Sequence, residues 1–180
     1  MNNNNTNQEE KKRKILVLDA SVVIPSSEVT LLEGLKVTVP EVRGELKDST
    51  SEMKFSSMIS SGELKEMEPT KESIEFVRRK SIEMGENLGD TDIKLISLAW
   101  ELKSSGEKVI LLTDDYGIQN VASMLDIPWK GVFQPGIREE VKWKWRCPAC
   151  GKTYNELVRR CEYCGTQVRR TGIGRGRKTT

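Results

Sequence analysis

Residues Ile15-Leu-Val-Leu-Asp19 form the stretch around which this sequence is organised. Four consecutive apolar residues are typical of a short strand that is buried on both of its faces. Open α/β sheets bind their ligands at the carboxyl ends of such strands, which is where Asp19 stands. We therefore predict that Asp19 is one of several carboxylates that hold a divalent metal ion. The alternative interpretation is that Asp19 only caps a helix beginning near Ser21.

Strands and helices alternate along the chain that follows. Further apolar runs predict strands at 37–39, 64–67 and 108–113, and helical patterns separate them. Because these runs are continuously apolar rather than alternating, we expect an α/β fold with a parallel sheet covered by helices on both faces. Residues 47–62 predict either a short helix or a flexible arm. In the predicted helix 71–84, we expect Ile82 to be among the buried side chains.

The composition restricts the chemistry that this chain can perform. The 180 residues include no histidine, which excludes a Ser-His-Asp triad and imidazole metal ligands. From Arg138 onward there are 12 basic and 4 acidic residues, whereas the rest of the chain holds 17 basic and 23 acidic ones. This asymmetry predicts an acidic body joined to a basic module that binds a polyanion. Without a long apolar run or a secretory signal, we expect a cytoplasmic protein with no membrane partner.

A second group of carboxylates supports the metal interpretation. Asp114 and Asp115 follow the predicted strand 108–113, Asp92 lies at the start of one helix, and Glu45 lies within another. Several carboxylates in one place raise each other's pKa unless a cation lies among them. Mg²⁺ and Mn²⁺ prefer such oxygen ligands. Each acid alone is explained more simply as a helix cap or a solvated residue, but their combination favours a metal site.

All four cysteines lie in two C-x₂-C motifs, Cys147-Pro-Ala-Cys150 and Cys161-Glu-Tyr-Cys164. This spacing predicts one structural zinc ion with four thiolate ligands. The alternative of two disulfides suits an oxidising compartment rather than the cytoplasm. Because four thiolates leave no coordination position for a substrate, the function of this module must lie in its surface.

Aromatic and basic side chains are interleaved around these cysteines. Trp143, Trp145, Tyr154 and Tyr163 suit stacking on bases, while neighbouring cations pair with phosphates. The alternative is that the aromatic residues form the small core of the module or its joint to the body, which we expect for at least one tryptophan. The predicted RNA-binding residues are Lys142, Lys144, Arg146, Arg159, Arg160, Arg169 and Arg170.

The motifs LDASVVI, VPEVRGEL, LGDTDIKLISLA and LLTDDYGIQNVA resemble those of PIN-domain nucleases over about residues 14–132. The resemblance implies a catalytic metal bound by several acids. In this sequence the matching acids are Asp19, Glu45, Asp92 and either Asp114 or Asp115.

Two of these assignments have a rival nearby. The Thr-x-Asp spacing of the family points to Asp115, but Asp114 is adjacent and remains open. Glu41 is the rival of Glu45, which is preferred because it directly precedes the apolar Leu46, as the family's glutamate usually does.

A PIN-type body followed by a four-cysteine zinc ribbon and a basic tail resembles the Nob-type ribosome-assembly endonucleases in their compact archaeal form. Membership implies cleavage of precursor small-subunit rRNA at its 3′ end, within a small ribosomal subunit precursor. We expect a disordered lead-in at 1–13, a nuclease domain at 14–136, a zinc ribbon at 137–170 and a flexible basic tail at 171–180. The alternatives are a toxin-type PIN ribonuclease and a non-catalytic RNA-binding assembly factor.

Overall fold

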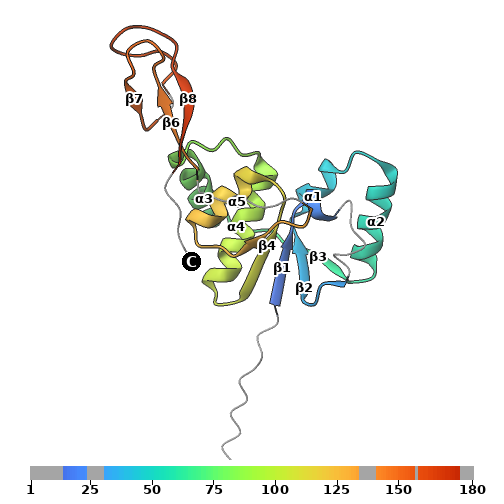
Figure 1. Cartoon of the computed structure of the whole chain (residues 1–180). Helices are drawn as coiled ribbons and strands as arrows, with labels where there is room; N and C mark the ends of the chain where they lie inside the picture. Colours follow the sequence, from blue (N-terminus) through green and yellow to red (C-terminus); the bar gives the residue numbers. More distant parts are fainter. Residues whose placement is uncertain (1–13, 24–30, 134–140, 157, 175–180) are drawn as a thin grey trace, which may run out of the picture.

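The computed structural model describes residues 14–23, 31–133, 141–156 and 158–174 (Figure 1). The body is built on a five-stranded sheet with the order β3-β2-β1-β4-β5, in which all neighbouring strands are parallel. Its strands are β1 (Lys14–Leu18), β2 (Leu35–Thr38), β3 (Leu64–Glu66), β4 (Lys108–Leu112) and β5 (Trp129–Lys130). The predicted α/β fold with a parallel sheet is therefore confirmed.

Helices cover the sheet on both sides (Figure 1). They are α1 (Ala20–Val23), the 3₁₀ helix η2 (Pro40–Glu45), α2 (Ser49–Ser60), α3 (Lys71–Glu83), α4 (Asp90–Ser104) and α5 (Tyr116–Met124). The central helix α4 packs against β1 and β4 and also against α3 and α5. This double cover explains why residues 15–18 of β1 are all buried. None of the helices in the described ranges is long and apolar enough to cross a bilayer.

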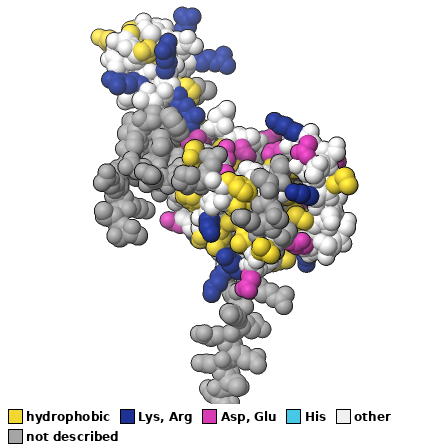
Figure 2. Space-filling model, turned by 45° about the vertical axis from the view of Figure 1, so that its right-hand side comes forward, with side chains coloured by type: hydrophobic (Ala, Val, Ile, Leu, Met, Phe, Trp, Pro, Cys, Tyr) yellow, Lys and Arg dark blue, Asp and Glu magenta, His cyan; other side chains and the backbone are white. Residues whose placement is uncertain are grey.

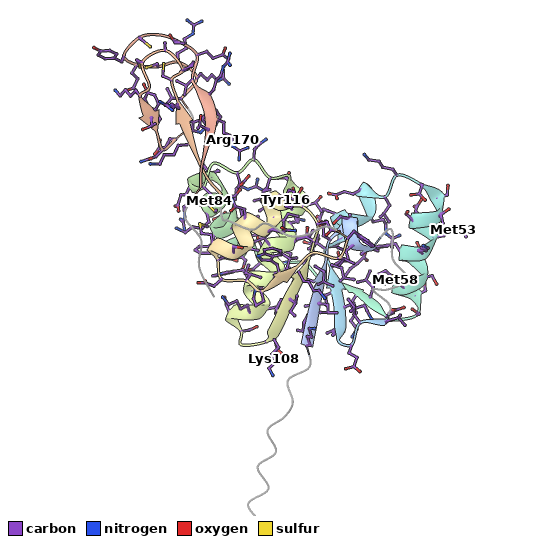
Figure 3. The ribbon with its side chains drawn as sticks, viewed as in Figure 1. Met53, Met58, Met84, Lys108, Tyr116 and Arg170 are labelled. Carbon is purple, nitrogen blue, oxygen red and sulfur yellow. The ribbon has the colours of Figure 1, made fainter. Side chains whose placement is uncertain are left out.

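Residues 49–60 form helix α2, so the helix was the correct alternative for this segment. Asp48 caps the helix by accepting a hydrogen bond of 2.9 Å from the backbone N–H of Ser51. Phe55 is fully buried and attaches the helix to the core. Met53 points away from the body and is 73% exposed (Figure 3). The sequence around Pro25 also predicts a loop, but residues 24–30 lie outside the described residues.

The prediction that Ile82 is buried is wrong, because its side chain is 66% exposed. Helix α3 instead turns Ser73, Val77, Ser81 and Met84 inward, at intervals of three and four residues. Ile82 follows Ser81 directly and so lies about 100° around the helix from that face. The two small serines at buried positions bring α3 close to α4, with which it packs.

A second sheet of three antiparallel strands has the order β7-β6-β8. We call it the ribbon: β6 (Val141–Arg146), β7 (Thr153–Tyr154) and β8 (Arg169–Gly174), with the segments between them. It projects from the end of the body where α3 and α5 lie (Figure 1). Strand β8 runs four residues into the segment expected to be a flexible tail, because its backbone pairs with β6 as far as Val141.

The interior of the ribbon is formed by cysteines and aromatic residues. Trp145, Tyr154 and Val158 pack against the buried Cys147, Cys161 and Val168. At least one tryptophan was expected to serve in this small core, and Trp145 confirms that expectation. The side chain of Trp143 lies outside the described residues.

Candidate functional site

The two strand-end motifs meet at one edge of the sheet. Strands β1 and β4 are parallel neighbours, with Leu18 opposite Leu112. The backbone N–H of Asp19 bonds to the carbonyl oxygen of Leu112 at 3.1 Å, which extends the ladder by one residue. Asp19 and Thr113 therefore leave the sheet side by side, as neighbouring strands predict.

Asp19 is buried, with 4% of its surface exposed, and hydroxyl groups hold its carboxylate. Ser21 and Thr113 each donate a hydrogen bond to its Oδ2 atom, at 2.7 and 2.8 Å. Burial raises the pKa of Asp19, these hydroxyl groups oppose the rise, and the charge of Asp115 adds to it. The helix α1 begins on the backbone carbonyl of Asp19, which accepts from Val22 at 3.0 Å.

Asp92 reaches the same edge from the first turn of α4. Its Oδ2 atom accepts a hydrogen bond of 2.9 Å from the backbone N–H of Gly89. Burial raises the pKa of Asp92 to about 6, and repulsion from Asp115, Asp19 and Glu45 contributes to this rise. Carboxylates from three other segments thus affect the ionisation of Asp92.

The adjacent Asp114 and Asp115 differ in what they contact. Asp114 accepts hydrogen bonds through Oδ1 from the backbone N–H groups of Val132 and Phe133, at 2.9 and 3.2 Å, and so holds the chain that leaves β5. Asp115 caps α5 by accepting from Gly117 at 2.7 Å, and its charge raises the pKa of both Asp19 and Asp92. This geometry favours Asp115 as the metal-binding acid.

The two rival glutamates, Glu41 and Glu45, also differ in what they contact. Glu45 is exposed at the end of η2, and its charge acts on Asp92. Glu41 forms an ion pair with Lys94 through Oε1, and its buried Oε2 atom has no hydrogen-bond partner among the described residues. The position of Glu41 beside Lys94 favours Glu45 as the acid of the site.

The donor atoms of the acidic site fit a hard divalent cation. They are all carboxylate oxygens, and their mutual repulsion is relieved when positive charge lies among them. In the part of the chain that the structure describes, only the four cysteines place three or more possible ligand atoms within 4.8 Å of one another. The acids do not form such a group among the described residues, so a metal ion at this edge stays a prediction.

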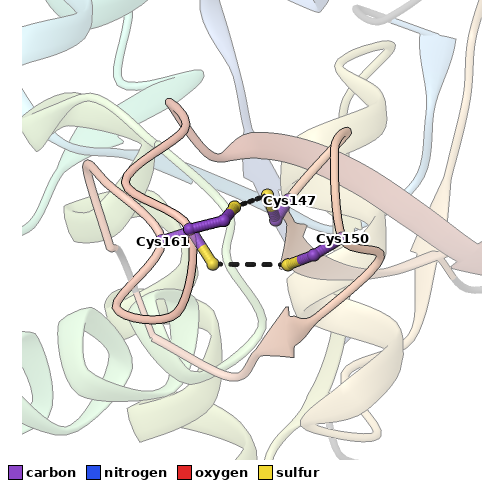
Figure 4. Close-up of side chains that lie close together, drawn as sticks. Cys147, Cys150 and Cys161 are labelled. Carbon is purple, nitrogen blue, oxygen red and sulfur yellow. Dashed lines mark hydrogen bonds between the residues drawn. The ribbon is translucent and has the colours of Figure 1, made fainter.

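The four cysteines converge in the ribbon (Figure 4). The sulfur atoms of Cys147 and Cys164 are 3.3 Å apart, and those of Cys150 and Cys161 are 3.5 Å apart. Tetrahedral zinc with Zn–S bonds of about 2.3 Å places its sulfur ligands about 3.8 Å apart. All four are free thiols, because a disulfide requires sulfur atoms at about 2.05 Å. The cluster therefore has the size and the donor atoms of a zinc site.

Both C-x₂-C motifs adopt the same turn. The carbonyl oxygen of the first cysteine accepts from the glycine after the second one, Gly151 to Cys147 at 3.0 Å and Gly165 to Cys161 at 2.8 Å. These glycines have φ angles of 76° and 71°, a region that favours glycine. The hydroxyl of Tyr154 donates to the sulfur of Cys161 at 3.0 Å, and this bond is the largest of several hydrogen bonds that lower the pKa of that thiol to about 6. Such a hydrogen bond favours the thiolate that zinc requires.

Most of the predicted RNA-binding cations lie on the surface of the ribbon (Figure 2). Lys144 is half-buried, while the exposed members are Arg146, Arg159, Arg160, Arg169 and Arg170. Arg170 also contacts Glu86 of the body at 2.9 Å. The side chain of Lys142 lies outside the described residues. Tyr163 is 81% exposed and is the aromatic residue best placed for stacking.

Two residues at the site did not follow from the sequence. Ser21 bonds to Asp19 and, through its Oγ atom, accepts from the backbone N–H of Asp114 at 3.3 Å. A serine two positions after the aspartate of the first strand was the available signal. Glu86 has no local signal, because its partner on the ribbon is 84 residues away in the sequence.

Comparison with known proteins identifies relatives along most of the chain. A family described as PIN domain of ribonuclease matches residues 16–102. Endoribonuclease Nob1 of Pyrococcus abyssi is 35% identical over 158 residues, which cover 86% of this chain and 91% of the relative. Endoribonuclease Nob1 of Methanocaldococcus jannaschii is 36% identical over 162 residues, or 87% of this chain and 77% of the relative. Ribonuclease VapC1 of Thermoplasma acidophilum is 30% identical over 158 residues, or 87% and 77%.

The match to the Nob1 proteins extends well beyond the PIN segment. PIN nucleases use divalent metal ions, which agrees with the carboxylate donors at the sheet edge, and the four-cysteine cluster of the ribbon can bind zinc. The alternative of a non-catalytic assembly factor is not supported, because these relatives are endoribonucleases. From its parallel sheet, its ribbon and its similarity to these enzymes, the chain belongs to the Nob1 family of PIN-domain endoribonucleases.

Proposed function

We propose that this endoribonuclease matures the 3′ end of small-subunit rRNA, acting in the cytoplasm on a precursor of the small ribosomal subunit. One observation carries the catalytic part of the proposal. Burial and three neighbouring carboxylates raise the pKa of Asp92 to about 6, at the edge where β1 and β4 end. The basic ribbon supports RNA as the substrate, and the family supports its identity as ribosomal.

Two metal sites are needed for this function. The catalytic site holds Mg²⁺ or Mn²⁺ through Asp19, Glu45, Asp92 and Asp115. Such an ion, when bound, supplies Lewis-acid activation of water and neutralises charge on the scissile phosphate. The structural site holds one zinc ion through Cys147, Cys150, Cys161 and Cys164, and stabilises a ribbon whose buried core is small.

The chain's own residues keep the acidic site in shape. Ser21 and Thr113 orient the Asp19 carboxylate through its Oδ2 atom, and the Thr113 hydroxyl also accepts from the backbone N–H of Asp115 at 3.0 Å. Asp115 is fixed in turn by the first-turn N–H groups of α5. These contacts hold two of the acids close together despite their repulsion, so that little rearrangement accompanies ion binding.

Substrate affinity resides mainly on the ribbon. An acidic body repels a polyanion, whereas the segment from Arg138 onward carries a formal charge of +8. The exposed Arg146, Arg159, Arg160 and Arg169 pair with phosphates, and Tyr163 stacks on an unpaired base. RNA binding and RNA cleavage are therefore separable by substitution.

The catalytic assignment is tested with Asp19→Asn on an RNA that contains the 3′ end of precursor small-subunit rRNA. We expect cleavage to fall by at least about a hundredfold, because one ligand charge is lost, while RNA affinity is retained. Asp90→Asn is the matched control, since Asp90 is exposed, pairs with Arg78 and lies two residues from Asp92. Cleavage by Asp19→Asn at the wild-type rate would show that the assignment of Asp19 is wrong.

A toxin-type ribonuclease is the second candidate, and the similarity to VapC1 favours it. The basic ribbon favours the first candidate, because toxin-type PIN ribonucleases are usually bare PIN domains. The wild-type protein distinguishes the two when precursor rRNA competes with an unrelated RNA of equal length. Equal cleavage of both RNAs would favour the toxin-type activity.

A further inference from the structure

A single ion pair connects the ribbon to the body among the described residues. Nη2 of Arg170, on β8, lies 2.9 Å from Oε2 of Glu86, in the loop between α3 and α4. The side chains are 32% and 10% exposed, so the pair is partly shielded from solvent. Arg170 lies at the base of the ribbon, on its side toward the body (Figure 3). A shielded pair of charged groups is stronger and more directional than a solvated one.

Glu86 is held rigidly on the body side. Its Oε1 atom accepts a hydrogen bond of 2.8 Å from Nδ2 of Asn120, which is buried on α5. Its backbone N–H bonds to the carbonyl of Ser81, and its carbonyl accepts from the Ser81 hydroxyl at 3.2 Å. The loop, α3 and α5 therefore hold this carboxylate together.

This carboxylate also lies beside the catalytic edge. A Cβ atom placed on Gly117 would be 3.7 Å from Oε2 of Glu86 and 3.1 Å from Oδ1 of Asp115. Gly117 belongs to the first turn of α5, and its N–H donates to Asp115. Arg170 of the ribbon is therefore tied to the helix turn that orients one of the proposed metal ligands.

On the ribbon side, Arg170 is part of the four-cysteine framework. It lies directly opposite Trp145 on β6, and Trp145 lies directly opposite Tyr154 on β7. Directly opposed residues of antiparallel strands share a face of the sheet. Trp145 and Tyr154 pack on the cysteine cluster, so a displacement of Arg170 displaces the whole ribbon.

Among the described residues, the strands of the ribbon pack mainly on one another rather than on the helices of the body. An open hollow separates the two parts, lined by the exposed Ile82 and its neighbours on α3 and by Asn155 and Glu156 of the ribbon. An open hollow contributes little close packing, and packing is what normally holds two domains in one orientation. The ion pair therefore carries more of this task.

We propose that Glu86 is a positioning residue, which fixes the ribbon through Arg170 so that RNA held on the ribbon reaches the carboxylate edge in one register. This inference rests on the proposed function, because it takes RNA to be bound on the ribbon and cleaved at that edge. It assigns Arg170 to the joint between ribbon and body.

The joint is tested first without RNA, on the full chain loaded with zinc. Backbone ¹⁵N relaxation gives the rotational correlation times of the ribbon and of the body separately. We expect one common value in the wild type and a shorter value for the ribbon in Glu86→Arg, where like charges face each other. The double variant Glu86→Arg with Arg170→Glu restores the pair with its charges exchanged and restores a common value. Glu86→Gln is the second variant, for use if the charge reversal fails to fold. It keeps an acceptor for Asn120 but loses the charge, so we expect a ribbon correlation time between those of the wild type and Glu86→Arg.

Cleavage supplies the second measurement. In single-turnover assays, Glu86→Arg cleaves an RNA that spans ribbon and catalytic edge about tenfold more slowly, in line with the loss of one charged hydrogen bond. A short oligonucleotide that reaches only the catalytic edge is cleaved at the wild-type rate, and the double variant recovers the long substrate. Glu72→Gln, an exposed glutamate at the start of α3 that does not line the hollow, is the matched control and changes neither measurement.

Separate tumbling of the ribbon in the wild type would overturn the proposal, as would a double variant that is folded and zinc-loaded but not restored. An equal loss on short and long RNA would also overturn it, because Glu86 would then act within the catalytic site rather than on the ribbon. If the wild type cleaves no RNA, the proposed function fails, while the relaxation measurement still decides the joint.

Discussion

The repulsion among the carboxylates predicts that an isosteric neutral residue stabilises the metal-free protein. The perturbation is Asp92→Asn, which removes one charge and keeps an oxygen for the N–H of Gly89. Burial and repulsion raise the pKa of Asp92 from 3.8 to about 6. At about 1.4 kcal/mol for each pH unit this difference has an upper bound of about 3 kcal/mol, and because the side chain is only partly buried, solvent screening reduces the effect to about 1–2 kcal/mol.

The sign of the effect follows from the direction of this pKa shift. An acid with a raised pKa in the folded state keeps its proton longer there than in the unfolded chain. The wild type therefore loses stability as pH rises from about 4 to above 6, where Asp92 becomes charged in both states. The variant does not bear this cost, so it gains about 1–2 kcal/mol at pH 7.5 and little at pH 4.

Urea unfolding of the metal-free protein at these two pH values measures the difference. Asp90→Asn is the control and shows no such pH-dependent gain, since Asp90 is exposed on the same helix turn. Added Mn²⁺ or Mg²⁺ stabilises the wild type by about 2.7 kcal/mol at a hundredfold excess over its dissociation constant, and stabilises Asp92→Asn less. Equal or lower stability of the variant at pH 7.5, or the same gain at both pH values, would refute the reasoning.

Three further predictions concern the neighbouring acids, the ribbon and its cations. Asp115→Asn removes one proposed ligand charge, so we expect cleavage to fall by at least about a hundredfold. Asparagine remains a good cap on α5, so the unfolding free energy changes by less than about 1 kcal/mol. Asp114→Ala leaves two backbone N–H groups unpaired and lowers the unfolding free energy by about 1–3 kcal/mol in urea titrations. Chelation of zinc abolishes the protection of backbone amides from hydrogen exchange in β6 and β8 but not in β1 and β4. Metal analysis of the untreated protein gives about one zinc per chain. Protection that persists in β6 and β8 after chelation would contradict the zinc assignment. In RNA-binding titrations, Arg159→Gln reduces the slope of log affinity against log salt by about 0.7, as expected for one lost phosphate contact, and an unchanged slope would remove Arg159 from the interface.

Patterns with a short range along the chain predicted much of the fold. The continuous apolar runs before Asp19 and Asp114 indicated buried parallel strands, and the structure confirms the sheet. The spacing of the C-x₂-C motifs predicted the four-cysteine cluster, because such spacing already defines the turn around each pair. The prediction that Ile82 is buried was wrong because helical periodicity reveals the buried face of a helix only when the buried positions are apolar. In this helix two of the buried positions are serines.

The sequence by itself determined which residues are available to the catalytic edge: Asp19 after its strand, two candidates after the next strand, and further acids on helices. Only the tertiary structure favours Asp115 over Asp114, because the N–H groups of Val132 and Phe133 that bind Asp114 come from a segment 18 and 19 residues away. It also placed Thr113 against Asp19 across 94 residues of sequence, and Arg170 against Glu86 across 84. Local periodicity and spacing report the conformation of one segment, whereas the partner of a charged or polar side chain depends on which distant segments the fold brings together.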